Sequence, residues 1–279
     1  WPADGGPVIG VCFDGTGYGV DGCVWGGEFL VADYGAFGRV AHLEYMPLPG
    51  GDAAIRHPAR LVVGYLRALF GPAWRETALG GLKLASLEEL SVTEVEVVCT
   101  QVQRGLNTPL TSSMGRLFDA VSALIGVRQR VSYEAQAAIE LEMRTMECGS
   151  RFFSLCKTPR YPFALTKRDG VSILGLRPLF EAILADMRAG VPVPEIGLEF
   201  HRSTATAIAV TCEAIASESG LRTVALSGGC FQNRLLLEMA TEQLGARGFR
   251  VLTHHQVPCN DGCIALGQAV IAGFGVMAK

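Results

Sequence analysis

The chain of 279 residues carries 24 Lys and Arg against 27 Asp and Glu, and 49% of its residues are apolar. That apolar share supports a substantial buried core and argues against disorder. The net charge of −3 and the isoelectric point near 6.0 give no support to partners bound through bulk charge, so we expect neither nucleic acid nor a membrane surface as a partner.

Cysteine usage and the start of the chain give two further expectations. The nine cysteines are scattered and form no C-x-x-C pair, which argues against a disulfide framework and for a reduced, cytoplasmic setting. No apolar run reaches the ~18 residues that a membrane-spanning helix needs. The first residue is Trp1 rather than Met, and no signal peptide precedes it, so we expect a fragment of a longer polypeptide.

The first part of the chain, residues 8–46, predicts three strands joined by glycine-rich turns, which form an antiparallel meander. The apolar run "VIGVCF" ends at Asp14, and "DGTGYG" (14–19) leads into the second strand. Taken alone, this segment favours a flexible hairpin turn, although successive backbone donors of such a hairpin can also wrap a phosphate. Asp14 is either a catalytic or metal-binding carboxylate at a strand end or an aspartate that caps a turn.

A helical section follows a loop over residues 47–58. The spacing of apolar residues predicts helices that begin near Ala59, Thr108, Ser132, Arg177 and Ile196. Residues 85–105 give no clear element, and residues 148–175 predict loops and edge strands. Asp119 and Glu140 fall in two adjacent helices of this section, where acidic residues on the exposed face are ordinary.

The last part of the chain predicts parallel strands with crossover helices. The run "TVAL" meets "SGGCFQN" (227–233), and a helix begins near Phe231. A second strand, "FRVLTHHQVP", leads into the loop "CNDGC" (259–263) and a final helix. This β-loop-α-β-loop-α order predicts one compact α/β unit with a helical section added to it.

Both loops of this last part allow two interpretations. A glycine pair before a helix is either a tight turn or a place where backbone N–H groups approach an anion. Asp261 is either an N-cap or a ligand for a metal or a metal-bound nucleotide. Two histidines and two cysteines near Asp261 could suggest zinc, but His254 and His255 are adjacent on a predicted strand and therefore point to opposite faces. Cys23 and Cys230 are interpreted as small buried apolar residues.

Six segments of the chain resemble, in this order, the C-terminal part of the hydrogenase-maturation carbamoyltransferase family: "GVCFDGTGYGVDGCVWGGEFL", "PLPGGDAAIR", "NTPLTSSMGRLFDAVSALIGV", "VSYEAQAAIELE", "ALSGGCFQNRLLLE" and "VPCNDGCIALGQA". The similarity runs from about residue 8 to residue 272. It implies an α/β, RNase H-like fold of the actin, heat-shock ATPase and sugar-kinase superfamily. The chain would then supply mainly the second lobe of that fold, together with the helical section.

The resemblance also implies roles for residues of these segments. Asp14 would be the catalytic carboxylate, and Asp261 of the "NDG" motif would bind a divalent metal, either iron, zinc or magnesium. Residues that contact ATP or carbamoyl-adenylate would be Gly15, Thr16 and Gly17 at the phosphates, Ser227, Gly228, Gly229 and Asn233 at the adenosine end, and Asp119 and Glu140 in the nucleoside pocket.

Members of this family use carbamoyl phosphate and ATP. The resemblance therefore implies transfer of a carbamoyl group from carbamoyl-adenylate to the C-terminal cysteine of a partner protein in [NiFe]-hydrogenase maturation. No internal cysteine has to act as the nucleophile. Two alternatives stay open, namely an O-carbamoyltransferase that acts on a small molecule and a nucleotide-binding module that has lost turnover.

The chain departs from the family pattern in several places. The family has two metal-binding histidines one helical turn apart, upstream of "DGTGYG", and this chain begins after that point. We therefore expect residues 1–279 to be a partial carbamoyltransferase domain, inactive alone, without its upstream lobe and without the adenylating, zinc-finger-like and acylphosphatase-like domains. Ala135 stands where we expect a glycine, and His57 stands where we expect a glutamate.

Overall fold

The computed structural model describes residue 2, residues 5–149 and residues 159–277. The part of the 148–175 segment that falls on residues 150–158 lies outside these described residues. Among the described residues, no helix is long and apolar enough to cross a membrane.

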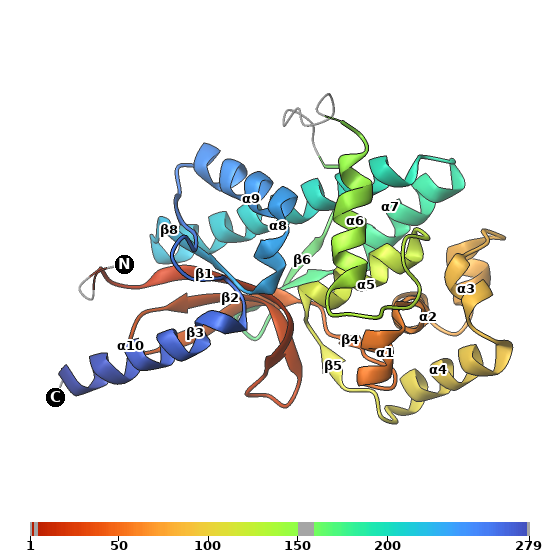
Figure 1. The fold of residues 1–279 in the computed structure, drawn as a ribbon, viewed down its shortest axis with the longest axis horizontal. Helices are drawn as coiled ribbons and strands as arrows, with labels where there is room; N and C mark the ends of the chain where they lie inside the picture. Colours follow the sequence, from red (N-terminus) through yellow and green to blue (C-terminus); the bar gives the residue numbers. More distant parts are fainter. Residues whose placement is uncertain (1, 3–4, 150–158, 278–279) are drawn as a thin grey trace.

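A mixed sheet forms the centre of the molecule (Figure 1). Within the described part of the chain it contains nine strands: β1 (Val8–Tyr18), β2 (Val24–Ala32), β3 (Phe37–Leu43), β4 (Met46–Pro47), β5 (Leu110–Thr111), β6 (Ala164–Arg168), β7 (Val171–Gly175), β8 (Thr223–Ser227) and β9 (Arg250–Leu252). Its main path runs in the order β6-β7-β3-β2-β1-β8-β9. Strands β1 to β3 are antiparallel neighbours, whereas β8 and β9 follow in parallel with β1. The order β3-β2-β1-β8-β9 is that of an RNase H-like lobe, as predicted.

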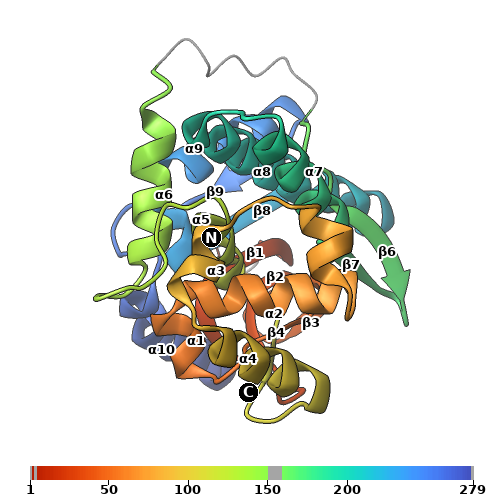
Figure 2. The ribbon, with the colours of Figure 1, turned by 90° about the vertical axis from the view of Figure 1, so that its right-hand side faces the viewer.

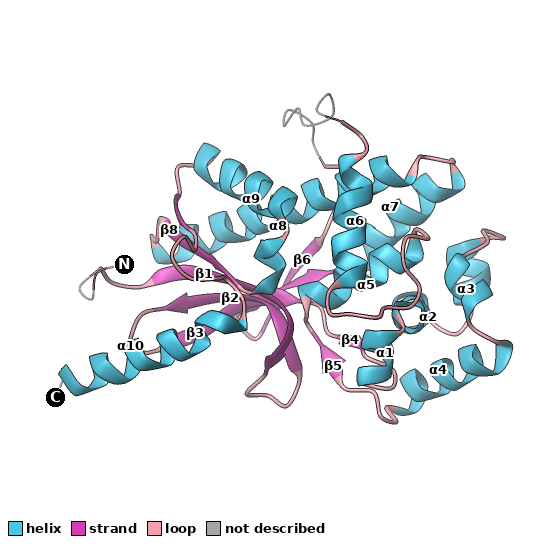
Figure 3. Ribbon diagram, in the orientation of Figure 1, coloured by secondary structure: helices cyan, strands magenta, loops and turns pink. Residues whose placement is uncertain are grey.

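Helices pack on the sheet and extend beyond it (Figure 3). They are α1 (Asp52–Arg56), α2 (Pro58–Phe70), α3 (Ala85–Glu89), α4 (Val92–Arg104), α5 (Met114–Leu124), α6 (Gln136–Met146), α7 (Arg177–Arg188), α8 (Val193–Ser219), α9 (Arg234–Ala246) and α10 (Ile264–Met277). Shorter turns are a π-helical turn, Arg75–Leu79, and 3-10 turns at Gly229–Gln232 and Asp261–Cys263. In the view of Figure 1, α8 and α9 lie above the sheet and α10 lies below it. The view turned by 90° shows α2 crossing in front of the sheet with α7 and α8 above it (Figure 2).

The core begins on the first strand because its apolar residues alternate. Ile9, Val11 and Phe13 lie on one face of β1 and are fully buried. The ring of Phe13 contacts Phe29 of β2 edge-on at 5.5 Å between centroids and stacks on Phe231 at 5.7 Å. Phe231 belongs to the 3-10 turn after β8, so the core itself fixes that turn against the first strand.

The structure corrects several element predictions, including the helix predicted from Thr108, which begins only at Met114 after β5. The segment "DGTGYG" is not a turn, because β1 continues to Tyr18 and the chain reverses over residues 19–23. The helix predicted from Ser132 begins only at Gln136, after Ala135 in a left-handed conformation. The strand predicted over "FRVLTHHQVP" ends at Leu252, so the argument that His254 and His255 alternate along a strand does not apply.

Candidate functional site

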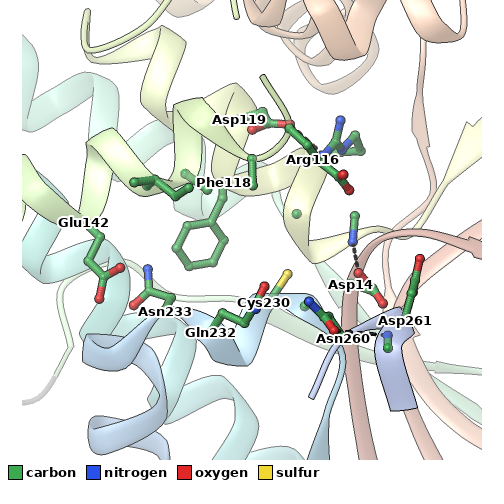
Figure 4. A pocket seen from close by; sticks show the side chains of 18 residues that line it. Asp14, Arg116, Phe118, Asp119, Glu142, Cys230, Gln232, Asn233, Asn260 and Asp261 are labelled. Carbon is green, nitrogen blue, oxygen red and sulfur yellow. Dashed lines mark hydrogen bonds and ion pairs between the residues drawn. The ribbon is translucent and has the colours of Figure 1, made fainter. Parts of the chain in front are cut away.

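One cavity of about 530 Å³ lies where the carboxyl end of β1 meets α5, α6 and the two C-terminal loops (Figure 4). It brings together five of the six quoted segments. The lining residues are Asp14, Gly15, Gly115, Arg116, Phe118, Asp119, Glu134, Ala135, Ala138, Ile139, Glu142, Gly229, Cys230, Gln232, Asn233, Asn260, Asp261 and Gly262. A cavity of this size accommodates a small organic ligand such as a nucleotide.

A bulge in β1 brings Asp14 and Gly15 into this cavity. Phe13 lies opposite Gly27 and Gly17 lies opposite Trp25, so residues 14–16 oppose a single residue of β2. The Gly15 N–H donates to the Asp14 carboxylate at 2.7 Å. Asp14 therefore reaches the site through an irregular strand rather than through a slack loop.

Two other residues predicted at the phosphates lie beside the cavity rather than in its wall. Thr16 is exposed to solvent, and Gly17 packs against the backbone of Trp25. An added Cβ on Gly17 would lie 3.1 Å from the Trp25 carbonyl oxygen, a tight contact against the neighbouring strand. The structure thus separates Asp14 and Gly15, which line the cavity, from the rest of the hairpin.

The N-terminus of α5 forms the wall that faces the bulge. Ser113 is the N-cap of this helix, and its hydroxyl accepts the N–H of Arg116 at 3.1 Å. The same hydroxyl lies 2.7 Å from the carbonyl oxygen of Asp14 and 2.8 Å from that of Gly15. Gly115 allows this approach, since a Cβ there would lie 2.7 Å from the Gly15 Cα. The helix end and the bulge are therefore held in direct contact.

Arg116 and Asp119 form a buried ion pair in this wall, with 3.0 Å between Nη2 and a carboxylate oxygen. Burial raises the pKa of Asp119, and the charge of Arg116 opposes that rise. Among the described residues, the buried Nε and Nη1 of Arg116 have no hydrogen-bond partner. The guanidinium of this cavity-lining residue therefore has two donors without an acceptor among the described residues. Sequence analysis missed Arg116; the signal was a basic residue three positions before Asp119 in a helix of otherwise small and apolar residues.

The "SGG" loop meets the same end of the sheet because β8 runs parallel to β1. Cys12 pairs with Ser227, so the loop that follows β8 lies beside the bulge at residues 14–16 of β1. An added Cβ on Gly229 would lie 3.0 Å from a carboxylate oxygen of Asp14, whereas one on Gly228 would lie 2.2 Å from the carbonyl oxygen of Phe13. Ser227 and Gly228 do not line the cavity, and the Ser227 hydroxyl lies 3.0 Å from Nε2 of His254. Of this loop, Gly229 and Asn233 reach the cavity wall.

The structure does not bring Glu140 into the cavity. Its carboxylate forms a two-pronged ion pair with Arg128, at 2.5 and 2.7 Å, on the outer side of α6. Glu142, which sequence analysis missed, lines the cavity instead and accepts the N–H of Leu235 at 3.1 Å. Burial raises the pKa of Glu142, opposed by hydrogen bonds from the backbone of α9. Two residues along a helix are about 200° apart, so only one of these acids can face the ligand.

The C-terminal loop contributes Asn260, Asp261 and Gly262 to the cavity, on the side of Asp14 (Figure 4). The Asn260 side chain accepts the N–H of Gly262 at 3.1 Å and caps the turn, so Asp261 is not the N-cap. Within the described residues, no cluster of three His, Cys, Asp or Glu could hold a metal ion. The oxygen donors of Asp14 and Asp261 fit a hard cation that shares the remaining positions with phosphate and water, and they do not make a closed zinc site.

Cys230 lines the cavity, but it is not prepared to act as a nucleophile. Burial raises the pKa of its thiol, and the nearby carboxylate of Asp14 raises it further. A buried thiol with a raised pKa stays protonated at neutral pH. This agrees with the interpretation of Cys230 as a small apolar residue.

The fold and the cavity define a class: an RNase H-like lobe with a polar cavity where its first strand meets the loops that follow β8 and β9. Residues 10–268 match the model of a family described as "Carbamoyltransferase, Kae1-like Domain, second subdomain". The chain belongs to this family, as the resemblance of the six segments predicted.

Known relatives extend the comparison. The chain is 37% identical to carbamoyltransferase HypF of Synechocystis over 94% of its own length, and 37% identical to HypF of Rhodobacter capsulatus over 98%. It superimposes on a crystal structure of full-length HypF in the phosphate- and nucleotide-bound form with a TM-score of 0.83 and 37% identity. It superimposes on a crystal structure of T.kodakarensis HypF with a TM-score of 0.82 and 32% identity. Each of these superpositions covers 98% of this chain. The chain spans about a third of the length of these relatives, between 33% and 35%.

Proposed function

We propose that the chain is the carbamoyl-transfer lobe of an enzyme of hydrogenase maturation, and that its cavity holds carbamoyl-adenylate made from carbamoyl phosphate and ATP. Membership of the family supports the reaction class, and a relative at 37% identity is known in a phosphate- and nucleotide-bound form. The acceptor is the C-terminal cysteine of a HypE-like partner protein in the cytoplasm.

The observation that carries the proposal is the guanidinium of Arg116. It is buried in the cavity wall, and within the described part of the chain only its Nη2 has a partner, the carboxylate of Asp119. Leaving charged donors buried and unsatisfied costs roughly 1–3 kcal/mol or more, which a bound anion would relieve. A planar guanidinium is also well suited to a phosphate, because it can donate two parallel hydrogen bonds.

The rest of the cavity suits the nucleoside end of an adenylate. Phe118 and Ile139 give the wall apolar surface, while Glu142 and Asn233 supply polar atoms on the side away from Arg116 (Figure 4). A carboxylate accepts two ribose hydroxyls well, and an apolar wall suits a base. In this orientation the phosphate lies between Arg116 and the bulge at Asp14.

The chemical step is an acyl transfer. The partner's thiolate attacks the carbamoyl carbon and forms a tetrahedral oxyanion. The bond from that carbon to the phosphate oxygen then breaks, and AMP leaves with the electron pair. Arg116 would neutralise charge that grows on the departing phosphate. The backbone N–H of Gly229, which lies beside Asp14 in the cavity wall, would supply a further donor to this phosphate.

A divalent cation would be held by Asp261, together with Asp14 and oxygens of the ligand. Such a cation would supply charge stabilisation at the phosphate. Magnesium best suits two carboxylates that share a cation with phosphate, whereas iron or zinc would need nitrogen or sulfur ligands from residues beyond this set.

Calorimetric titration of the chain with AMP tests the proposal. The wild-type protein should bind AMP, and Arg116→Gln should weaken binding by at least roughly tenfold, since an interaction with a charged group is lost. Arg128→Gln is the matched control, because it removes an arginine from the ion pair outside the cavity. Absence of AMP binding by the wild type, or equal affinity of Arg116→Gln and wild type, would contradict the proposal. Arg116→Lys keeps the charge beside Asp119 if the first variant does not fold.

A further inference from the structure

A cluster of polar residues lies behind the cavity without lining it. We call it the Glu28 cluster; its members are Asp21, Glu28, Arg39, Tyr45 and Ser112. Asp21 lies in the turn between β1 and β2, Glu28 lies in β2 and Arg39 lies in β3. Tyr45 follows β3, and Ser112 precedes α5. The five side chains form one hydrogen-bonded network, in which Arg39 and Ser112 contact the carboxylate of Glu28 directly.

Glu28 is the centre of the cluster and is only 2% exposed. One of its carboxylate oxygens accepts the backbone N–H groups of Gly26 and Gly27, at 2.5 and 2.7 Å. These are the residues that face the β1 bulge, and a Cβ on Gly26 would lie 2.5 Å from the carbonyl oxygen of Asp14. Glu28 therefore fixes the backbone on which the bulge of Asp14 rests.

The other carboxylate oxygen of Glu28 joins two further elements. It accepts the hydroxyl of Ser112 at 2.5 Å and Nη2 of Arg39 at 2.8 Å. Ser112 is followed by Ser113, the N-cap of α5, whose hydroxyl contacts the carbonyl oxygens of the bulge. One carboxylate thus connects the backbone opposite the bulge with the start of the helix that carries Arg116.

Arg39 is itself held from several sides. Its Nη1 donates to the hydroxyl of Tyr45 at 2.7 Å and to Asp21 at 3.2 Å, and its guanidinium lies 4.1 Å from the centre of the Trp25 ring. Trp25 also donates its ring N–H to Asp21 at 2.9 Å. A guanidinium bound in this way has little freedom, so the position of Glu28 is set by β3 and the hairpin turn.

We propose that Glu28 and Arg39 are positioning residues that fix the contact between the Asp14 bulge and the N-terminus of α5, the two elements that carry Asp14 and Arg116 at the phosphate end of the cavity. The inference rests on the proposed function, since it concerns the same cavity. Neither residue touches the ligand. Their effect reaches it through the backbone of Gly26 and Gly27 and through Ser112.

A second buried ion pair serves as the matched control. Glu199 and Arg202 in α8 lie 2.7 Å apart and are as deeply buried as the Glu28 pair, with side-chain exposures of 6% and 8%. Neither lines the cavity. Glu199→Gln should therefore reduce stability in a similar way to Glu28→Gln, while only the latter should disturb the phosphate end of the cavity.

The test combines calorimetry with AMP and amide hydrogen exchange on the 279-residue chain. We expect Glu28→Gln to weaken AMP binding roughly tenfold, because a small misplacement of binding groups is costly, and to speed exchange selectively over residues 14–17 and 113–116. Glu199→Gln should keep wild-type affinity and exchange in these segments. Arg39→Lys should weaken binding less than Glu28→Gln, and it replaces that variant if Glu28→Gln does not fold.

Two different outcomes would contradict the inference, and they can be distinguished from each other. If the wild type binds AMP and both glutamine variants bind it equally well, Glu28 is structural only and the inference is wrong. If the wild type binds neither AMP nor inorganic phosphate, the proposed function fails and the inference fails with it.

Discussion

The ring of His201 in α8 lies 2.9 Å from the side-chain amide of Asn233 at the cavity wall. Nδ1 of His201 lies 2.7 Å from the carbonyl oxygen of Gly197, which can only accept, so Nδ1 carries the proton and Nε2 accepts from the Asn233 amide nitrogen. The Asn233 oxygen in turn accepts the N–H of Leu236 at 2.8 Å. A neutral His201 therefore fixes the orientation of Asn233, which sequence analysis predicted as a nucleotide-binding residue without its buried partner.

This pair predicts a loss of stability in acid. Burial lowers the pKa of His201 from 6.5 to about 4. Between these values the unfolded chain binds a proton that the folded chain does not, so the free energy of unfolding falls as the pH falls from 6.5 to 4, by roughly 3 kcal/mol in all. Urea unfolding at several pH values measures it. His201→Gln should flatten this dependence, whereas the exposed His255→Gln should keep it; equal slopes in all three proteins would contradict the prediction.

Substitution of the two glutamates of α6 should affect AMP binding differently, because only Glu142 lines the cavity. Glu142→Gln should weaken binding roughly tenfold, because a charged acceptor in the cavity is lost. Glu140→Gln should leave affinity within about twofold, since its carboxylate pairs with Arg128 outside the cavity. Calorimetric titration of both variants decides between these acids. A larger effect of Glu140→Gln would restore the residue that the sequence predicted.

The RNase H-like fold was predicted by the resemblance of the six segments, and the β-loop-α-β order of the last part predicted its parallel strands. Because β8 runs parallel to β1, the residues after Cys12 and after Ser227 lie at the same edge of the sheet. The choice between Glu140 and Glu142 was not predictable in this way. It depends on where α6 begins and on how the helix is rotated, which tertiary packing decides.

The partners of Glu28 could not be predicted from the sequence for a different reason. Its segment "WGGEFLVA" reads as a buried strand, and the single acid in it was a signal that a partner must exist. The partners, Arg39 and Ser112, lie 11 and 84 positions away, and no spacing rule connects residues of different elements. Arg116 was overlooked for the same reason, because the sequence does not show which nitrogens of a buried arginine lack partners.

Ala135 predicts a stabilising substitution. It has a φ of +59° as the N-cap of α6, a conformation that costs an alanine about 1 kcal/mol and a glycine almost nothing. Ala135→Gly should therefore raise the free energy of unfolding by about 1 kcal/mol in urea titration, which also accounts for the glycine expected at this position. Ala138→Gly in the interior of the same helix is the control and should lower stability by about 1 kcal/mol. A loss of stability in Ala135→Gly would contradict the prediction.

Removal of divalent cations should weaken the binding of ADP, provided that Asp261 is present to hold the cation. With Mg²⁺ present, the wild type should bind ADP more tightly than in EDTA, because Asp261 and Asp14 would share the cation with the phosphates. Asp261→Asn should lose this difference and bind in both buffers as the wild type does in EDTA. Calorimetry in the two buffers measures the effect. A Mg²⁺ dependence that persists in Asp261→Asn would remove Asp261 from the cation site.

Two glycines of the C-terminal half predict opposite changes in stability when each is replaced by alanine. Gly228 has a φ of +102°, and a Cβ there would lie 2.2 Å from the carbonyl oxygen of Phe13, so Gly228→Ala must push the "SGG" turn away from β1. We expect Gly228→Ala to lower the free energy of unfolding by about 3 kcal/mol or more. It should also weaken AMP binding, because Gly229 and Cys230 move with the turn. Gly245 in α9 has no atom within 4 Å of an added Cβ, so Gly245→Ala should gain up to about 1 kcal/mol. Urea unfolding of both variants measures the contrast, and a mild effect of Gly228→Ala would show that the close approach of the turn to the first strand is not needed for the cavity.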